Sequence, residues 1–522
     1  MKEKAHFKIL SSGDISRVNY AGSVHSKDVA IEPAREICVR DEVDVLVAGG
    51  GLGGVSAAVA AARAGAKALL IERNGFPGGV STAGMCCSVF NCFYTPSHEL
   101  VVKGNALEFV EELAKAEGPG SSWHNHKGHI IYDIERGKLV LIELLEKAGV
   151  DYLFDTIITN VIMEGNVLQG VFIESKSGRE AVKAKVIVDA TGDADVAHFA
   201  GAPLHQIHEK MRARHSYCFR VGNVDVDKLV NYFIKNPDQY PQFMDVDWDL
   251  KEAIAQYKKT GTFLFPHGGG MQLDSIKKGV ASGEYKTTLG VYNSLDALQM
   301  HAIRNLSIVH IVTGFCNIDD MDVSKITRAM TDGKRMAFYI TDYFQKHIPG
   351  FEKACVIGTA DDLGMRATRW IDGEFVFTED MRSNPTKFKD AIGRGVVQRN
   401  YVKNKAAGAW SVQTFIDQTF DVPYRCLLPR GIEGLLMGAG RSVSASNPFL
   451  LRTMALTMVV GQGAGAAAAV SAQTGVTPRN VNIAAVQEEL ERQGVSLNND
   501  RSILSVQNGE VGKTAMEQPL EE

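Results

Sequence analysis

The amino-acid sequence predicts an α/β protein in which a Rossmann-like domain with a parallel sheet is discontinuous along the chain and carries an inserted α+β domain. Two observations predict this fold. Short β-branched runs and Ala-rich helical runs recur near both ends of the chain. The glycines, 51 of 522 residues, concentrate beside these runs at 49–54, 75–84, 192–201 and 431–465. Residues 206–419 instead carry longer polar loops and isolated aromatic residues, as expected of an inserted domain.

Length, charge and cysteine content restrict the function. The 522 residues are enough for roughly three domains, and 56 basic and 61 acidic side chains give a formal net charge of −5. Nucleic-acid binding normally requires clustered Lys and Arg, so we expect no nucleic-acid partner. A small-molecule substrate is expected, and a homo-oligomer is left open. The 8 cysteines show no C-x-x-C spacing, so neither a metal site nor a disulfide scaffold is expected.

Two segments bear on the cellular location. The N-terminal residues Met1–Lys8 are charged and lack a continuous apolar run, which favours the cytoplasm over secretion. The longest apolar stretch, Met454–Ala472, is interrupted by Gly461, Gln462 and Gly463. A membrane-spanning helix needs about 20 mostly apolar residues, so we interpret this stretch as a buried helix and expect no membrane span.

The first glycine cluster has the form of a dinucleotide-binding turn. A β-branched run, Val43–Ala48, leads into G-G-G-L-G-G, and the Ala-rich run Val55–Ala64 follows. This order places a strand, a tight turn and a helix N-terminus in succession, where backbone N–H groups and the helix dipole can bind a pyrophosphate. The residues of the turn are Gly49, Gly50, Gly51, Leu52, Gly53 and Gly54.

The glycines of this turn have separate expected roles. Gly49 permits the tight turn, Gly51 lets the backbone approach the pyrophosphate, and Gly54 allows the helix to pack closely. A second strand, Lys67–Ile71, leads to Glu72, which lies 18 residues after Gly54. An acidic side chain at that place can accept hydrogen bonds from an adenosine ribose. An ordinary glycine-rich turn between strand and helix is the alternative.

The second glycine cluster decides which dinucleotide is expected. Residues 73–84 read R-N-G-F-P-G-G-V-S-T-A-G. This segment resembles the G-G-x-x-T-x-G segment of FAD-dependent oxidoreductases related to the fumarate reductase and succinate dehydrogenase flavoproteins. The resemblance implies FAD as cofactor, with the segment running along the pyrophosphate and ribityl chain toward the flavin ring. The residues implied are Arg73, Gly78, Gly79, Thr82 and Gly84. A surface loop is the alternative.

Two distant segments extend the resemblance. A strand-like run, Val186–Asp189, is followed by A-T-G-D, similar to the motif with which such flavoproteins bring a later strand back beside the first. Near the other end, residues 435–441 read L-L-M-G-A-G-R and look like the family's strand ending in A-G-R. The cofactor contacts implied by these segments are Ala190, Thr191, Gly192, Asp193, Gly440, Arg441 and Asn447.

A further glycine-rich segment precedes the Ala-rich run Ala466–Val470 and is expected to open a helix. The N-terminus of that helix would stabilise the negative charge that develops at the flavin N1/C2 carbonyl on reduction. Tight helix packing is the alternative reason for these glycines. The residues concerned are Gly461, Gln462, Gly463 and Ala464.

The implied organisation is a flavin domain in two pieces. We expect an N-terminal arm at 1–40, an FAD-binding domain at 41–205 and 420–495, a substrate or capping domain at 206–419, and a C-terminal tail at 496–522. The first piece should include a helix around Ile134–Ala148 and a β excursion through Tyr152–Lys185. Ligands of open α/β sheets bind outside the carboxyl ends of the strands, so the substrate should lie where the capping segment covers the flavin.

Few residues are candidates for catalysis, because a flavin exchanges hydride at N5 and the protein mainly orients the substrate and handles one proton. His215 begins a strand-like run whose even offsets place Tyr217 and Phe219 on its face, with Arg220 on the other. A satisfied or surface histidine is the alternative for each histidine. The candidates are Arg452, Arg366, His310 and His215.

The arginines could bind a substrate carboxylate. Arg366 and Arg369 have the i, i+3 spacing of one helical face, and a structural ion pair is the alternative for them. Arg452 ends S-A-S-N-P-F-L-L-R, where fumarate-reductase-like relatives carry H-G-A-N-R. The missing His disfavours fumarate reduction and covalent flavin attachment at this place.

The cysteines Cys86, Cys87 and Cys92 follow the second glycine cluster and read C-C-x4-C. A redox dithiol normally has C-x-x-C spacing. Small buried hydrophobic residues are therefore the preferred interpretation, with a redox pair as the alternative. No metal ligand is expected among them.

These observations predict an FAD-dependent oxidoreductase, a dehydrogenase or reductase that moves a hydride between flavin N5 and a small organic substrate, anionic if the arginines bind it. One alternative is a flavin hydroxylase that uses NAD(P)H and dioxygen; such hydroxylases usually carry G-D-A-A-H where this late strand ends in Gly440 and Arg441. Another alternative is a non-catalytic flavin-binding assembly module. The electron acceptor is left open among a quinone, a protein and dioxygen.

Overall fold

The computed structural model describes residues 35–497, apart from 90–92, 118–129, 208–213, 241–249, 266–272, 291–292, 295–297, 319–320 and 403–410. The chain divides into two compact units. Unit 1 consists of residues 1–35, 208–243 and 264–364, and unit 2 of residues 36–207, 244–263 and 365–522. The sequence-based division placed residues 365–419, and also residues 250–263, in the capping segment, whereas both stretches lie in unit 2.

Unit 2 is built on a mainly parallel sheet with strand order β5-β2-β1-β8-β7-β6, in which β20 also pairs with β8. The strands β5, β2, β1, β8 and β20 are parallel to one another, whereas β6, β7 and β8 form an antiparallel excursion. Their bounds are β1 Val39–Ala48, β2 Ala68–Ile71, β5 Asp151–Leu153, β6 Ile157–Glu164, β7 Val167–Ser175, β8 Gly178–Asp189 and β20 Leu435–Met437. The predicted Rossmann-like parallel sheet is confirmed.

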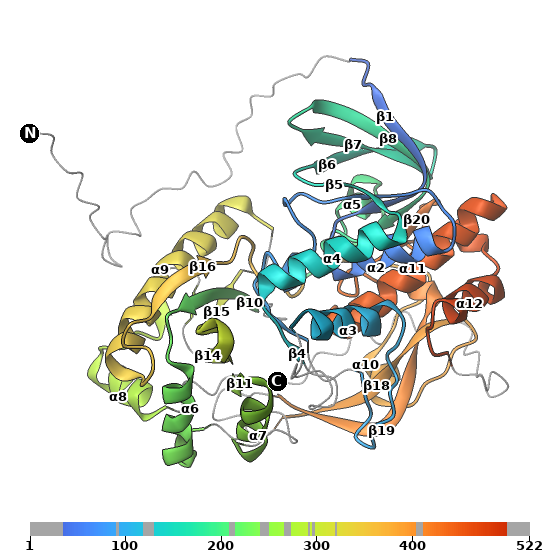
Figure 1. Ribbon diagram of the computed structural model, residues 1–522. Helices are drawn as coiled ribbons and strands as arrows, with labels where there is room; N and C mark the ends of the chain where they lie inside the picture. The colour runs from blue at the N-terminus through green and yellow to red at the C-terminus, as the bar shows by residue number, and fades with distance from the viewer. Residues whose placement is uncertain are drawn as a thin grey trace, which may run out of the picture. The chain divides into compact units, whose positions relative to one another are not determined.

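Helices α2 and α11 of unit 2 lie beside this sheet, and α4 lies next to α2 (Figure 1). Ala and Val fill α2, and Asp133 and Gly149 flank α4, whose predicted bounds are confirmed. Gly149 has φ 76°, the left-handed conformation that commonly ends a helix. The bounds are α2 Leu52–Arg63, α3 Asn105–Glu117, α4 Ile134–Ala148, α5 Asp195–Phe199, α7 Leu250–Thr260, α10 Glu379–Ser383, α11 Met454–Thr474 and α12 Ile483–Arg492.

Residues 365–419 belong to unit 2 because they pair and pack with its elements. β17 Arg369–Ile371 pairs with β9 Leu204–Gln206, and β18 Ala391–Val402 pairs with β19 Ser411–Pro423. A short hairpin, β3 Ser88–Val89 with β4 Ile130–Ile131, completes the unit. The polar composition of 365–419 did not show these pairings, because strand pairing across long sequence separations leaves no local pattern.

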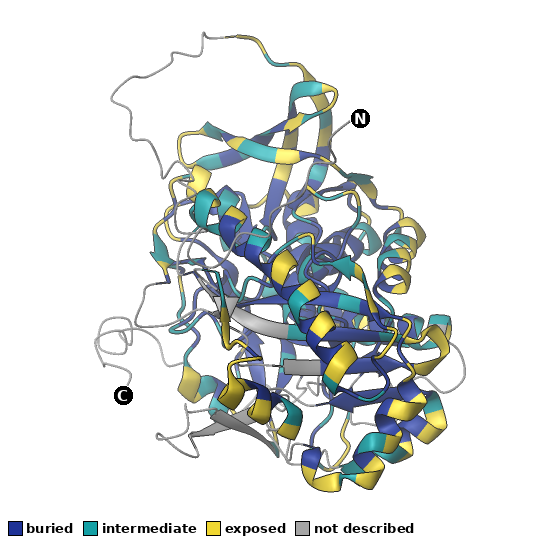
Figure 2. Cartoon of the chain, turned by 90° about the vertical axis from the view of Figure 1, so that its left-hand side faces the viewer, coloured by how far each residue is buried: buried dark blue, intermediate teal, exposed yellow. Residues whose placement is uncertain are grey.

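Unit 1 contains an antiparallel sheet with strand order β11-β14-β15-β10-β16. Surface helices such as the 25-residue α9 bury one face and expose the other, as the two-coloured helices in Figure 2 illustrate. The bounds are α6 Val226–Lys235, α8 Asp274–Ser282, α9 Val323–His347, β10 Arg214–Gly222, β11 Thr262–Phe265, β12 Thr288–Leu289, β13 Asn293–Ser294, β14 Leu298–Ile303, β15 Ile308–Asn317 and β16 Cys355–Thr359.

The long helix α11 is a core element of unit 2. In the part of the chain that the structure describes, it is the one helix long and apolar enough to cross a membrane. However, 89% of its most apolar 18-residue stretch is buried inside the protein. Small residues let it approach α2 closely: a Cβ at Gly461 would overlap the carbonyl oxygen of Gly53, and one at Gly465 that of Ala57. The Ser56 hydroxyl donates to the Met458 carbonyl oxygen at 2.7 Å.

The expectation that Gly461, Gln462, Gly463 and Ala464 open a helix is wrong. The helix α11 begins at Met454, so these residues lie in its interior and are buried. The absence of a side chain lets Gly461 approach Gly53 of α2 and lets Gly463 approach Ile392 of β18. The N-cap residue of the helix is Thr453, which directly follows Arg452.

Substitutions in α11 should separate backbone contact from side-chain contact. We expect Gly461→Ala to destabilise the protein by about 1–3 kcal/mol, because the new Cβ meets a backbone carbonyl that cannot move alone. Gly463→Ala is the comparison variant: it gains the same helix propensity, but its Cβ would meet the side chain of Ile392 (Cδ1, Cβ and Cγ1) and no backbone carbonyl, so we expect it to lose less stability. Urea unfolding of both variants measures the difference, and an equal or smaller loss for Gly461→Ala would contradict this packing.

Candidate functional site

Most glycines of the turn between β1 and α2 lie so close to neighbouring atoms that a side chain would not fit. Gly51 is the exception. Gly49 has φ 97°, and its N–H donates to the Ile71 carbonyl oxygen at 2.8 Å. A Cβ at Gly54 would overlap the Gly49 carbonyl oxygen, and one at Gly53 that of Gly438. A Cβ at Gly51 would meet nothing within 4 Å. Gly51 therefore faces open space at the point where a pyrophosphate was expected.

Gly51 is also the N-cap residue of α2. No side chain caps this helix, and no acidic residue lies in its first turn. The first N–H groups of a helix lack partners within the helix and attract anions. Leu52, the first residue of α2, is buried, so the backbone rather than its side chain faces the open space. The turn therefore fits a bound pyrophosphate.

Glu72 holds the turn from the second strand. Its Oε2 accepts from the Gly50 N–H at 2.6 Å, and its Oε1 accepts from the backbone and side-chain amides of Asn74 at 2.8 and 3.0 Å. The side chain is 5% exposed. A carboxylate has further lone pairs, so these contacts orient it and leave the predicted ribose contact compatible with the geometry.

The second glycine loop lies against the first. The Gly78 N–H donates to the Gly50 carbonyl oxygen at 2.7 Å, and a Cβ at Gly79 would lie 3.2 Å from the Gly51 Cα. The Thr82 hydroxyl donates to the Pro77 carbonyl oxygen at 2.7 Å, so it shapes the loop itself. Gly84 is required by a close approach to the Val80 carbonyl oxygen. Arg73 is exposed at the start of the loop.

The A-T-G-D segment reaches the same turn from β8. A Cβ at Gly49 would lie 2.7 Å from the Ala190 carbonyl oxygen. The carboxylate of Asp189 is fully buried and accepts from the Thr191 hydroxyl at 2.7 Å and from the Ala197 N–H at 3.0 Å. Burial raises the pKa of Asp189, while these hydrogen bonds act against that rise.

The late A-G-R strand is tied to A-T-G-D by Arg441. Its Nε donates to the Gly192 carbonyl oxygen at 2.7 Å, and Nη2 donates to Asp193 Oδ1 at 2.8 Å. A Cβ at Gly440 would overlap the Leu451 carbonyl oxygen. Asn447 uses its Oδ1 to accept from the Phe449 N–H at 2.9 Å. The ion pair between Arg441 and Asp193 joins chain segments that are 248 residues apart in the sequence.

Arg366 and Arg369 do not share a helix, so the helical-face expectation is wrong. Residues 364–368 form irregular backbone, and Arg369 begins β17. Arg369 Nη2 donates to Asp195 Oδ1 at 2.5 Å, which is the structural ion pair considered as the alternative. The burial of Asp195, and next the charges of Asp193 and Asp189, raise its pKa to about 6.

Arg452 lies just before the N-terminus of α11 and is surrounded by positive charge. Burial, and then the guanidinium of Arg366, lower the pKa of Arg452 to about 9, and Cys86 acts in the opposite direction. Its Nε is buried and, among the residues that the structure describes, has no hydrogen-bond partner. The Thr453 hydroxyl is likewise buried without a partner there. No acidic residue lies in the first turn of α11.

The two candidate histidines lie in unit 1. His215 is on β10 and His310 on β15, and they are 0% and 1% exposed. The side chain of Tyr217 faces α9, because a Cβ at Gly333 would meet its ring. Since His215 alternates with it at an even offset, His215 shares this face and Arg220 lies on the other, as predicted.

The cysteines give no sign of a redox pair. Cys86 is half-buried and Cys87 fully buried, both as free thiols, whereas Cys92 lies outside the described residues. Burial raises the pKa of the Cys86 thiol, and the charges of Arg366 and Arg452 act against this rise. No group of three or more His, Cys, Asp or Glu suited to a metal ion occurs within the described part of the chain.

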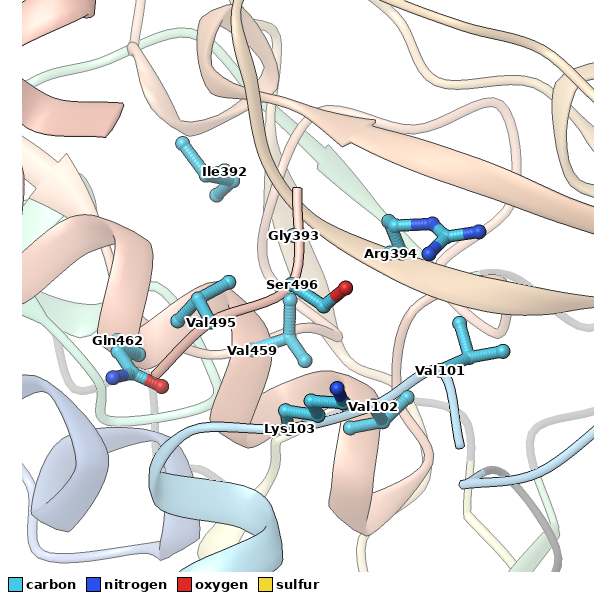
Figure 3. Close-up of a pocket in the computed structure, with 10 residues that line it drawn as sticks. All are labelled: Val101, Val102, Lys103, Ile392, Gly393, Arg394, Val459, Gln462, Val495 and Ser496. Carbon is cyan, nitrogen blue, oxygen red and sulfur yellow. The ribbon is translucent and has the colours of Figure 1, made fainter. Parts of the chain in front are cut away.

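Gln462 is committed to contacts within the protein. Figure 3 shows it in a small cavity of unit 2 that Val101, Ile392 and Val459 also line. Its Oε1 accepts from the Asn105 N–H at 2.9 Å. None of the residues of the glycine turn lines this cavity. We therefore assign Gln462 to the packing of α11 against α3.

Comparisons with known proteins agree with this geometry. A family model described as FAD dependent oxidoreductase matches residues 44–490. The digeranylgeranylglycerophospholipid reductase of Haloferax volcanii is 31% identical over 157 residues, 29% of this chain and 36% of that protein. The thiamine thiazole synthase of Methanococcus aeolicus is 30% identical over 166 residues, 30% of this chain and 57% of that protein.

Among solved structures, a geranylgeranyl bacteriochlorophyll reductase-like protein of Thermoplasma acidophilum is similar over 87% of this chain and 83% of its own, at 15% identity and a TM-score of 0.38. The chain spans less than two thirds of the length of the curated relatives that it matches.

A side chain at Gly51 should displace the cofactor without harming the fold. Because a Cβ at Gly51 meets no protein atom within 4 Å, we expect Gly51→Val to fold normally but to lose bound FAD, whose pyrophosphate would occupy that space. The absorbance ratio at 450 and 280 nm, on the order of 0.1 for a loaded flavoprotein of this size by typical chromophore absorption, measures loading, and circular dichroism checks the fold. A fully loaded variant would refute the assignment.

The thiol of Cys86 should react slowly. The nucleophile is the thiolate, and burial raises the pKa of Cys86, so we expect its alkylation by iodoacetamide at pH 8 to be roughly tenfold slower than that of exposed Cys355, and to accelerate only at higher pH. Peptide mass spectrometry over time measures both rates. A disulfide-linked Cys86 peptide, or equal rates, would favour the redox pair instead.

Proposed function

Because the chain belongs to the FAD-dependent oxidoreductase family, we propose that this enzyme is a dehydrogenase or reductase that moves a hydride between FAD and a small organic anion. The cofactor is FAD, and its flavin ring supplies the two-electron chemistry. The residues of this chain then have three tasks: to hold the dinucleotide, to bind the substrate, and to exclude competing charges. The glycine turn and Glu72 support the first task.

Arg452 carries the proposal for an anionic substrate. Arg452 is partly buried, and its Nε is fully buried. A guanidinium withdrawn from water is costly unless an opposite charge compensates it. Two of the three neighbouring arginines have such compensation in a printed ion pair, since Arg441 pairs with Asp193 at 2.8 Å and Arg382 with Glu379 at 2.7 Å. Arg452 makes no ion pair with the residues that the structure describes, and its pKa of about 9 reflects the burial and the surrounding cations.

An anion bound beside Arg452 would remove this imbalance. The guanidinium can donate to a carboxylate with fixed geometry, and the N-terminus of α11 adds partial positive charge within one turn. Both features lie in unit 2, which also contains the glycine turn. The arrangement supports a substrate carboxylate, with the Arg452 side chain orienting it toward the transferred hydride.

The direction of turnover is proposed as either oxidation or reduction. The Haloferax relative is named a reductase, which supports the reductive direction. Anaerobic mixing of the loaded enzyme with matched pairs of hydroxy or amino acids and their neutral amides tests oxidation, with loss of flavin absorbance near 450 nm as the readout. Dithionite-reduced enzyme mixed with enoates and enamides tests reduction.

We expect acids, and not their amides, to change the flavin spectrum. If the amides react as well as the acids, the proposed role of Arg452 in binding the substrate carboxylate is wrong. Substrate-dependent consumption of NAD(P)H with incorporation of oxygen would identify a hydroxylase instead. Failure of every donor and acceptor in both directions would favour a non-catalytic flavin-binding module.

Removal of the Arg452 charge should weaken substrate binding and leave the cofactor in place. We expect Arg452→Met to raise the KM for an acid substrate roughly tenfold or more, and Arg452→Lys to recover part of the loss. Arg430→Met is the control, because Arg430 is exposed and paired with Asp372. Steady-state kinetics together with flavin content measure the effect; a loss of flavin with unchanged KM would assign Arg452 to the cofactor.

A further inference from the structure

Three strands of unit 1 bring a row of basic side chains onto one face of the antiparallel sheet. The register places His310 of β15 directly opposite Arg220 of β10 and, on its other side, opposite His301 of β14. Directly paired residues point to the same face, with Cβ atoms about 4.5–5.5 Å apart. We call Arg220, His310 and His301 the basic row.

The basic row lies on the face opposite to α9. Tyr217 faces α9, where a Cβ at Gly333 would meet its ring, and Arg220 is three residues further along β10. Both register shifts of β10 place the extra residue in the neighbouring strand, so the alternation along β10 is unbroken. Arg220, and with it His310, therefore points to the other face, away from His215.

His310 is buried without a protein partner. It is 1% exposed, and neither Nδ1 nor Nε2 has a hydrogen-bond partner within the described part of the chain. Buried polar groups in native proteins are nearly always hydrogen-bonded, and leaving one unsatisfied destabilises the folded state. An imidazole retained in a core under this cost points to a partner that is not part of the protein.

The chemistry of that partner follows from the row. Burial, and next the charge of Arg220, lower the pKa of His310 to about 3, so its ring is neutral and offers one N–H donor and one acceptor nitrogen. Arg220 adds a permanent positive charge and several donors. Gly358 of β16, opposite Arg220, places no side chain on this edge of the row. An oxyanion can accept from the N–H of His310, and the positive charge of Arg220 favours an anion over a neutral partner beside it.

We propose that the basic row binds a small oxyanion, a carboxylate or a phosphate, held by Arg220 and by the N–H of His310. His301 lies beside it as the third member of the row. The basic row belongs to unit 1, whereas the residues of the proposed function belong to unit 2. The inference therefore does not depend on that function, and binding can be measured without turnover.

Isothermal titration of the loaded enzyme with succinate and, separately, with inorganic phosphate tests the site and distinguishes the two classes of oxyanion. The Arg452→Met background removes the other proposed anion contact, so binding that remains belongs to the basic row. We expect Arg220→Met and His310→Phe in this background to weaken the binding of the preferred anion at least tenfold. His347→Gln, at a half-buried position paired with Glu284 in the same unit, should leave it unchanged.

His310→Phe also separates binding from a structural role. Phenylalanine fills a similar volume and removes the unsatisfied nitrogens, so thermal unfolding without anion should be unchanged or shifted upward. With anion, the unfolding temperature of the parent should rise and that of the variant should not. If His310→Phe fails to fold, Arg220→Met and the imidazole nitrogen shifts of 15N-histidine-labelled enzyme, which must move on addition of the anion, decide the question.

Binding of equal strength in the Arg220→Met and His310→Phe proteins would overturn the proposal. So would the absence of binding of both anions to the Arg452→Met protein, or imidazole nitrogen shifts of His310 that do not respond to either anion. Loss of acid turnover in Arg452→Met with intact anion binding would support both proposals, since the two sites would then have separate roles.

Discussion

The candidate site depends on backbone packed directly against backbone around the N-terminus of α2. Gly54 lies against the Gly49 carbonyl, Gly53 against Gly438, and Gly461 of α11 against Gly53. Any Cβ at these positions would overlap a carbonyl oxygen, so the segments can meet only where side chains are absent. This constraint holds the first strand, the late A-G-R strand and α11 together. It leaves Gly51 as the one glycine of the turn with open space before it.

The arginines of the site also fall into two groups: those that pair with a carboxylate of the protein, and Arg452, which does not do so within the described part of the chain. Arg441 and Arg369 have carboxylates within hydrogen-bond distance, and both hold the A-T-G-D segment in place. Their positive charges are paired with these carboxylates and so join distant parts of the chain. Arg452 keeps its charge without such a partner. A guanidinium of the first kind stabilises the fold; one of the second kind is available for a ligand.

Local patterns predicted the elements that depend on local physics. The strand, glycine turn and helix at 43–64 and the helix Ile134–Ala148 were found in place, because propensity and capping act over a few residues. The start of α11 was missed: its glycines pack against α2, and the N-cap Thr453 follows a loop with no distinctive pattern. The pairing of β17 with β9 was missed as well, since residues about 165 apart carry no local signal of contact (Arg369 opposite Gln206).

The same limit explains why a strand pattern alone did not reveal the basic row. Alternation along β10 correctly set Arg220 apart from His215, but the partners of Arg220 depend on register, and a slip of one residue would exchange the faces. Register is fixed here by buried apolar side chains such as the paired Phe219 and Ile311, which lie on the face opposite to the basic row. Those apolar residues therefore determine the position of His310. A polar side chain held so firmly, at a cost in stability, is better explained by a ligand than by packing, because an apolar residue of the same volume would pack as well without that cost.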